Sequence, residues 1–189
     1  GQYAGALDNG GENLRLDDAN GEKILDFAYD NKWYPITDGF GFSLVIVDEN
    51  AAWDTWGLKE SWRPSGQMRG SPGSNDPPRA TVAGILINEL LSNTDPPQVD
   101  AIELYNPTTD PVDLGGWFIT DDATNAFKFR IPPGTSVPAG GYAVFTEAEF
   151  NPGGTGFAFS SRGDEVYLLS GDANTNLTGY IHGFNFGAA

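Results

Sequence analysis

Residues 101–117 read AIELYNPTTDPVDLGGW, and this stretch decides the fold. Its first five residues alternate apolar and polar side chains, which is the pattern of a half-buried β-strand. An Asn-Pro pair at 106–107 and an Asp-Pro pair at 110–111 then favour turns. Val112 and Leu114 bring apolar side chains back after the turn. The stretch therefore predicts a short strand, a corner and a return to the interior of a β-sandwich.

Six further stretches show the same short apolar or aromatic runs, separated by loops rich in Gly, Pro, Asn and Asp. Proline has no N–H to donate, so Pro132, Pro133 and Pro138 mark loops between them. The predicted strands are residues 85–91, 101–105, 117–120, 126–131, 141–146, 165–169 and 180–186. Short strands at intervals of roughly 12 residues suit an all-β, immunoglobulin-like β-sandwich.

The N-terminal part repeats the end of this pattern. Residues 7–16 (LDNGGENLRL) align with residues 159–168 (FSSRGDEVYL), and both stretches lead into a polar turn and a second strand. Residues 1–31 are therefore predicted to form a hairpin, an additional N-terminal β segment. An isolated two-stranded hairpin is marginal in water. We therefore expect residues 1–69 to pack against residues 83–189, or against a second copy of the chain by strand exchange.

The Gly, Ser and Pro residues that follow this part indicate a domain boundary. The segment GSPGSNDPP at 70–78 is the strongest such signal in the chain. The predicted organisation is a remnant of one module with a trailing segment at 1–69, a linker at 70–81 and a complete module at 82–189.

Composition and charge exclude several classes of protein. The 26 acidic and 10 basic residues give a net charge of −16, which disfavours nucleic acid and anionic membranes as partners. The chain has no cysteine, so it forms no disulfide or thiolate zinc site. No apolar run is long enough for direct membrane insertion, and any export signal is expected upstream of Gly1.

Four motifs occur in the order of a known family. INEL (87–90), AIELYNPTTDPVDLGGW (101–117), FRIPPGTSVPAGGYAVF (129–145) and SSRGDEVYLL (160–169) resemble the lamin tail domain family. The resemblance covers residues 83–187, and residues 7–31 resemble the last hairpin of a preceding copy. It implies an immunoglobulin-like sandwich. For bacterial members it implies an exported, multidomain protein, located outside the cell or at its surface, in which the module accompanies hydrolase or kinase-like domains.

The residues that are able to carry chemistry do not form a catalytic pattern. His182 is the only histidine, so any His-based triad or imidazole metal cage depends on it alone. It lies in an alternating strand, which favours a structural role. The acid pairs are Glu89 with Glu103, Asp121 with Asp122, and Glu147 with Glu149. Asp121-Asp122 is predicted to begin a turn and Glu147 and Glu149 to lie in a solvated loop. Glu89 and Glu103 are predicted to point outward or to hydrogen-bond to loop backbone, and we expect no catalytic residues and no enzyme activity.

Two acidic turns have the atom types of a calcium site. Calcium takes carboxylate and carbonyl oxygens, which the turns offer at Asp17, Asp18 and Asn20 and at Asp172 and Asn174. Neither turn has the spacing of an EF-hand loop, and each is also a satisfactory hairpin turn without a metal. Calcium is thus the one cofactor that the sequence leaves open.

Trp53, Trp56 and Trp62 lie within ten residues of one another in a loop-like stretch. Aromatic surfaces rimmed by polar groups are typical recognition sites, here for a protein or a surface glycan. The competing interpretation, which we favour, is that these residues pack over an open sheet edge.

The leading functional hypothesis is a non-catalytic interaction or spacer module of an exported bacterial multidomain protein. One alternative is an accessory domain of a secreted nuclease or phosphatase whose catalytic domain lies elsewhere. The other is a calcium-stabilised adhesive repeat.

Overall fold

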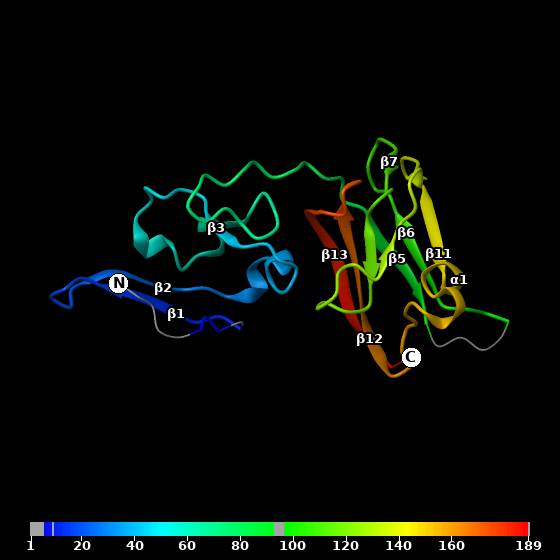
Figure 1. Cartoon of the computed structure of the whole chain (residues 1–189), viewed down its shortest axis with the longest axis horizontal. Helices are drawn as coiled ribbons and strands as arrows, with labels where there is room; N and C mark the ends of the chain where they lie inside the picture. Colours follow the sequence, from blue (N-terminus) through cyan, green and yellow to red (C-terminus); the bar gives the residue numbers. More distant parts are fainter. Residues whose placement is uncertain (1–5, 9, 93–96, 189) are drawn as a thin grey trace. The chain divides into compact units, whose positions relative to one another are not determined.

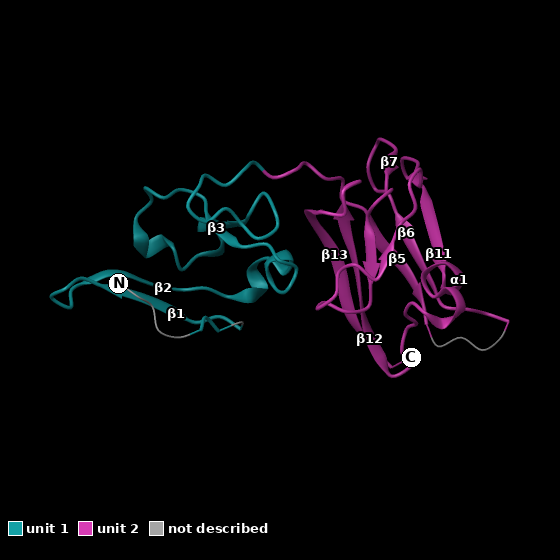
Figure 2. Cartoon of the chain, in the orientation of Figure 1, with its two compact units in different colours: residues 1–78 teal, residues 79–189 magenta. Residues whose placement is uncertain are grey.

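The computed structural model describes residues 6–8, 10–92 and 97–188. The chain forms two compact units, residues 1–78 and 79–189 (Figure 2). Every paired strand in both units is antiparallel to its neighbour (Figure 1). None of the helices in the described ranges is long and apolar enough to cross a membrane.

The first unit consists of two short two-stranded sheets joined by 3-10 turns. One sheet is the β1–β2 hairpin, and the other pairs β3 with β4. The elements are β1 (Asn13–Asp17), β2 (Lys23–Ala28), η1 (Asn31–Trp33), η2 (Pro35–Thr37), β3 (Leu44–Ile46), η3 (Trp53–Thr55), η4 (Lys59–Ser61) and β4 (Trp62–Pro64).

A small aromatic cluster holds the hairpin to the rest of this unit. The Phe27 ring lies 5.7 Å from the Trp56 ring and 5.5 Å from the Trp62 ring, between centroids. Ile36, Phe40 and Phe42 are also buried. The hairpin therefore packs on other residues of its own unit. The sequence suggested two other arrangements, on residues 83–189 or on a second copy of the chain. Packing of residues 1–69 on the module, or on a second copy, stays a prediction.

The segment before the second unit is tied to the first by Asp76. Its carboxylate, 4% exposed, pairs with Arg63 and accepts hydrogen bonds from Gly66 N (2.9 Å) and Ser71 Oγ (3.0 Å). Burial raises the pKa of Asp76, but these hydrogen bonds outweigh it and leave the pKa below its usual value. Residues 71–76 of the segment predicted as a linker are thus folded onto the first unit.

The second unit is a β-sandwich. Its larger sheets have the strand orders β11-β6-β5 and β13-β12-β8-β9, and β10 pairs with β7. The elements are β5 (Leu86–Leu91), β6 (Ala101–Tyr105), β7 (Val112–Asp113), β8 (Phe118–Thr120), β9 (Phe129–Arg130), β10 (Ser136–Val137), β11 (Tyr142–Thr146), α1 (Glu147–Phe150), η5 (Pro152–Gly154), β12 (Gly163–Gly171) and β13 (Leu177–Gly187).

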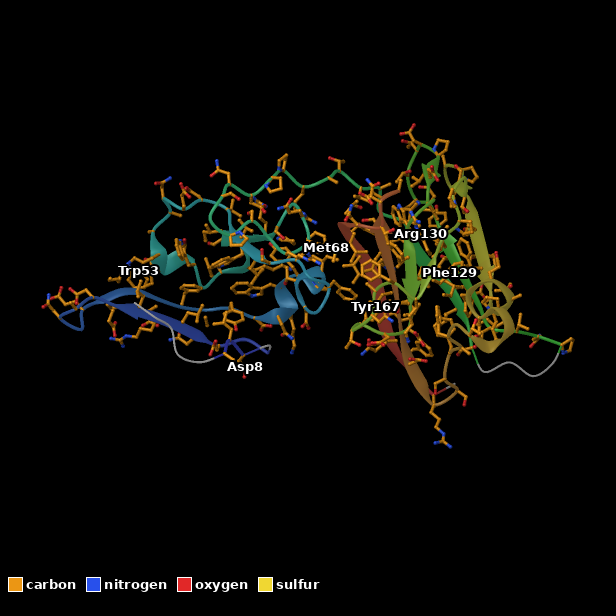
Figure 3. All side chains as sticks on the ribbon, in the orientation of Figure 1. Asp8, Trp53, Met68, Phe129, Arg130 and Tyr167 are labelled. Atoms are coloured by element: carbon orange, nitrogen blue, oxygen red, sulfur yellow. The ribbon has the colours of Figure 1, made fainter. Side chains whose placement is uncertain are left out.

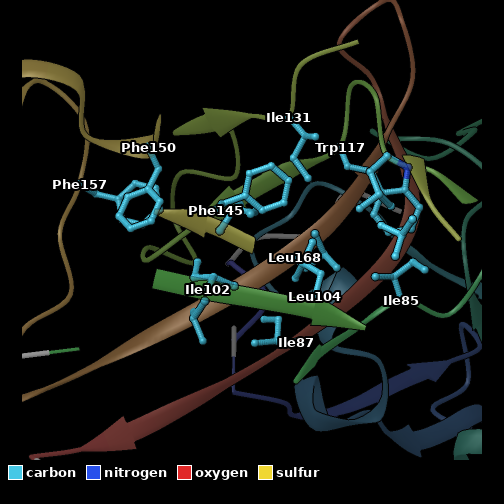
Figure 4. Packing of buried hydrophobic residues seen from close by; sticks show 14 of the residues in the cluster. Ile85, Ile87, Ile102, Leu104, Trp117, Ile131, Phe145, Phe150, Phe157 and Leu168 are labelled. Atoms are coloured by element: carbon cyan, nitrogen blue, oxygen red, sulfur yellow. The ribbon is translucent and has the colours of Figure 1, made fainter. Parts of the chain in front are cut away.

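The core of the second unit lies between these sheets. Ile102 and Leu104 of β6 and Leu168 of β12 are fully buried and face one another, and Trp117 is 5% exposed (Figure 4). The alternation in AIELY thus directs its apolar residues inward as predicted. The predicted β-sandwich is confirmed.

The strand boundaries differ from prediction in the middle of the unit. Residues 126–131 were expected to form one strand, but the strand is limited to Phe129–Arg130, with Ile131 continuing through backbone bonds to Trp117 and Gly116. Ala126 is buried and Phe127 packs on Phe118 in the loop before it. Between the predicted loop prolines, Ser136–Val137 forms β10 against β7. Residues 147–150 form a short helix that begins with a capping box of Thr146 and Glu149.

Candidate functional site

The N-terminal hairpin repeats several hydrogen bonds of the last hairpin of the sandwich. Gly11 N donates to Asp8 O (3.3 Å), and Gly163 N donates to Ser160 O (3.2 Å). The two glycines have φ angles of 108° and 104°, which side chains rarely adopt. A further pair of bonds repeats: Asp8 N to Glu12 Oε1 (3.2 Å), and Ser160 N to Asp164 Oδ2 (2.9 Å). The sequence repeat is therefore a structural repeat.

The turns at the tips of the two hairpins are also equivalent. Asp18 N donates to Glu22 O (2.8 Å), and Asp172 N donates to Asn176 O (2.9 Å). In both turns Oδ1 of the aspartate accepts the N–H groups two and four residues later. Thr175, with a φ angle of 69°, stands where the first turn has Gly21.

The hairpins differ in what lies beside their first strands. In the sandwich, β12 pairs with β13 on one side and with β8 on the other. In the first unit, β1 pairs with β2, and the structure describes no strand on its other side. The edge of β1 at Arg15, Leu16 and Asp17 corresponds to the edge of β12 that β8 occupies. This open edge, residues 13–17, is the candidate site.

The apolar face next to the open edge is exposed at Leu7 and Leu16, while Phe27 on the same face packs on Trp56 and Trp62. Leu16 corresponds to Leu168, which is fully buried in the sandwich, yet Leu16 is 52% exposed. Leu7 corresponds to the buried Phe159 and is 61% exposed. Leu7 also lines a groove of about 380 Å³, whose other lining residues are mainly apolar and include Leu14, Phe27, Phe42, Leu44 and Trp62. At Leu7 and Leu16 the first unit thus exposes to solvent positions that are buried in the sandwich.

The three tryptophans proposed as a binding surface divide between two roles. The rings of Trp56 and Trp62 lie 6.0 Å apart in the Phe27 cluster, and Trp62 Nε1 donates to Trp56 O. Trp53 is 36% exposed, with Lys23 Nζ 4.7 Å from its ring centroid. Figure 3 marks its position near β2. Trp53 is thus the exposed member of the trio, and a binding role for it stays a prediction.

The acidic turns proposed for calcium use their carboxylates within the turn. The N–H groups of Glu22 and Asn20 bond to Asp18 and lower its pKa. Asn176 does the same for Asp172, through its side chain and its N–H. Of the other residues proposed for calcium, Asp17 forms an ion pair with Arg15 at 2.8 Å. Asn20 and Asn174 donate their backbone N–H groups to Asp18 and Asp172. The described ranges contain no group of three or more His, Asp or Glu residues arranged to hold a metal ion.

The carboxylate pairs bond to nearby side chains and backbone groups. Glu103 lies opposite Glu89 on the neighbouring strand and accepts a hydrogen bond from Asn88 Nδ2 (2.7 Å). The other two pairs bond locally: Asp121 and Asp122 to Lys128 (2.7 and 3.5 Å), Glu147 to Asn151 (2.9 Å), and Glu149 to Thr146 N (2.8 Å). None of these contacts sets two carboxylates at one shared pocket.

His182 links the two sheets of the sandwich. Its Nδ1 accepts a hydrogen bond from Ile87 N at 3.1 Å, and the neighbouring Tyr180 hydroxyl donates to Ile85 O at 2.7 Å. Burial lowers the pKa of His182 below its usual 6.5. Because an acceptor nitrogen must be unprotonated, the link requires the neutral ring.

Acid is expected to destabilise the sandwich through His182. Its lowered pKa means that its contribution is fully present above pH 6.5 and is lost as the pH falls through the folded pKa. We expect a loss of about 0.5–1.5 kcal/mol, near the lower end because the ring is partly exposed. Urea unfolding between about pH 8 and pH 5 measures it. His182→Asn keeps an acceptor oxygen without titrating, so an equal pH dependence in this variant would contradict the assignment.

The family comparison agrees with this architecture. The family model described as Lamin Tail Domain matches residues 78–182, which is more than half of the chain. No match was found among curated proteins or among solved structures. The resemblance seen in the sequence is confirmed, and with it the immunoglobulin-like fold of the sandwich. The chain belongs to the lamin tail domain family.

Proposed function

We propose that the chain is a non-catalytic interaction and spacer module of an exported bacterial multidomain protein. The observation that carries the proposal is the repeated hairpin, residues 7–29 against 159–186. The equivalent turns and matching φ angles support the presence of part of a second lamin tail module in the same chain. Tandem modules are a common way to hold other domains apart and to present edges and faces to partners.

The contacts of the polar residues support a non-catalytic role. The acid pairs cap a helix, bind Lys128 or bond to neighbouring amides, and His182 accepts from a backbone amide. A general acid or base needs a site where its proton reaches a substrate. Export and a location outside the cell are proposed from the bacterial members of the family, with the absence of cysteine as a compatible feature.

Light scattering coupled to size-exclusion chromatography tests this proposal against the calcium-stabilised adhesive repeat. We expect a single-chain mass that is the same with calcium and with chelator, because the Asp18 and Asp172 carboxylates already accept backbone hydrogen bonds. Association that requires calcium, or a large calcium-dependent rise in Tm, would favour the adhesive repeat. Asp18→Asn and Asp172→Asn would then abolish the calcium effect.

An activity assay tests the non-catalytic part. We expect no hydrolysis of nucleic acid or of a phosphate monoester by the chain at concentrations well above those used for enzymes. Turnover that disappears in Glu103→Gln and remains in the exposed control Glu60→Gln would overturn it.

A further inference from the structure

We propose that the open edge of β1 binds a β8-type strand, supplied by a lamin-tail sandwich that lacks its own last hairpin. The partner strand would lie antiparallel to residues 13–17, as β8 lies beside β12. This inference rests on the proposed function, because it uses the equivalence of the two hairpins, and it names the partner of the interaction module.

The hydrogen bonds within the hairpin show which backbone groups of β1 point away from β2. Tyr29 N donates to Glu12 O (3.1 Å), so residue 12 belongs to a hydrogen-bonded pair. Such pairs alternate along an antiparallel ladder, which directs the polar backbone groups of Leu14 and Leu16 toward β2. The N–H and C=O groups of Asn13, Arg15 and Asp17 therefore point outward. In the part of the chain that the structure describes, no strand pairs with these groups, and an unpaired edge is a template for another strand.

The sandwich shows which strand fits this edge. β8 reads Phe118-Ile119-Thr120 and pairs with β12 through Leu169, Leu168 and Tyr167. All three β8 residues are buried, at 1% exposure or less. The corresponding residues of β1 are exposed. A partner with this alternation would place an apolar side chain beside Leu16, on the face that the sandwich covers with its other sheet.

A second folded copy of this chain does not offer such a strand. Its β8 lies between β12 and β9 in the sheet order β13-β12-β8-β9, so both edges of β8 are already paired. A sandwich without the last hairpin would expose one edge of β8 and the apolar residues beside it. The β1–β2 hairpin has the equivalent turns and the exposed Leu16 to pair with it, on shorter strands of five and six residues against nine and eleven in β12 and β13.

The test uses the whole chain and a labelled peptide with the sequence of residues 115–122, GGWFITDD. We expect binding detected by fluorescence anisotropy, and protection of the Arg15 amide from hydrogen exchange. The Leu16 amide, which already faces β2, should change little. A scrambled peptide of the same composition is the ligand control.

Two substitutions at one position isolate the edge. Arg15→Pro removes an outward N–H, and proline is tolerated on an edge strand, so the β1–β2 ladder should remain. Arg15→Thr keeps the N–H, and both variants lose the ion pair with Asp17. We expect Arg15→Pro to bind the peptide about tenfold more weakly than Arg15→Thr. Unchanged hydrogen-exchange protection of the Leu16 and Leu25 amides would show that the hairpin is intact.

Three outcomes would overturn the inference. They are absence of peptide binding to the original chain, equal binding by the two variants, and a dimer of the chain that Arg15→Pro dissociates, since the last would make a second copy the occupant. The first two leave the proposed function standing if the chain is a catalytically inactive, calcium-independent monomer. Hydrolytic activity or calcium-dependent association would defeat the proposed function whether or not the peptide binds.

Discussion

Replacing Asn106 by alanine is expected to lower the free energy of unfolding of the sandwich by about 3–5 kcal/mol. Its fully buried Nδ2 lies 2.8 Å from Asp110 O, 3.0 Å from Val137 O and 3.1 Å from Pro138 O. Its Oδ1 accepts from the N–H and hydroxyl of Thr108. Alanine would leave these groups without their partner in a place that water does not reach. Urea unfolding followed by amide signals of residues 97–188 measures the loss.

Asn106→Asp separates the donor from the acceptor role. Aspartate keeps an oxygen for Thr108 but sets a negative charge against the carbonyl oxygens, so we expect at least as large a loss at pH 7. Asn88→Ala is the matched control, because Asn88 is exposed and makes one side-chain bond. It should change stability by less than about 0.5 kcal/mol. A small effect of Asn106→Ala would mean that the corner is held by backbone contacts alone.

Phe150→Ala is the second substitution with a large expected effect, a loss of about 3–5 kcal/mol. The ring is 1% exposed and stacks on Phe157 with 4.8 Å between centroids. Phe159 at 5.8 Å and Phe129 at 6.5 Å complete the cluster. Alanine would leave a cavity lined by aromatic rings, and these rigid side chains would relax only partly into it. The same urea experiment measures it.

The control for this substitution is Phe127→Ala. Phe127 also contacts one aromatic ring, Phe118 at 5.0 Å, but it is 43% exposed. We expect a loss of about 1 kcal/mol. Similar losses in the two variants would contradict the central place given to Phe150. Amide signals of residues 10–78 serve as an internal reference, because both substitutions lie in the other unit.

The sequence predicted the sandwich because its determinants are local. Alternation in AIELY, the Asn-Pro and Asp-Pro corners and the spacing of glycines are set within a few residues, and β6 and β11 begin or end within one residue of prediction. The role of Asn106 was not predicted beyond a turn. Its acceptors at 137 and 138 come from a segment about thirty residues away, and local patterns contain no information on such pairing.

The candidate site was half predictable. The repeat of residues 7–16 in residues 159–168 is visible in the sequence, and it located the hairpin. The open edge was not visible, since it depends on sheet order, which places β8 beside β12 and no described strand beside β1. The division of the tryptophans also needed the structure. Phe27, 26 to 35 residues distant, decides that Trp56 and Trp62 are packed while Trp53 is exposed.

The side-chain links between β5 and β13 have a mechanical consequence. The bonds from Tyr180 to Ile85, just before β5, and from Ile87 to His182 advance in the same direction along both segments, so the chain runs in the same direction in the two segments where they meet, without pairing in one sheet. Tension applied between residue 79 and residue 187 would pull them past each other lengthwise. Both hydrogen bonds would then bear the force together instead of breaking one at a time, which is why shear geometry resists force better than opening from one end. A module that spaces other domains under stretch would resist extension in this direction.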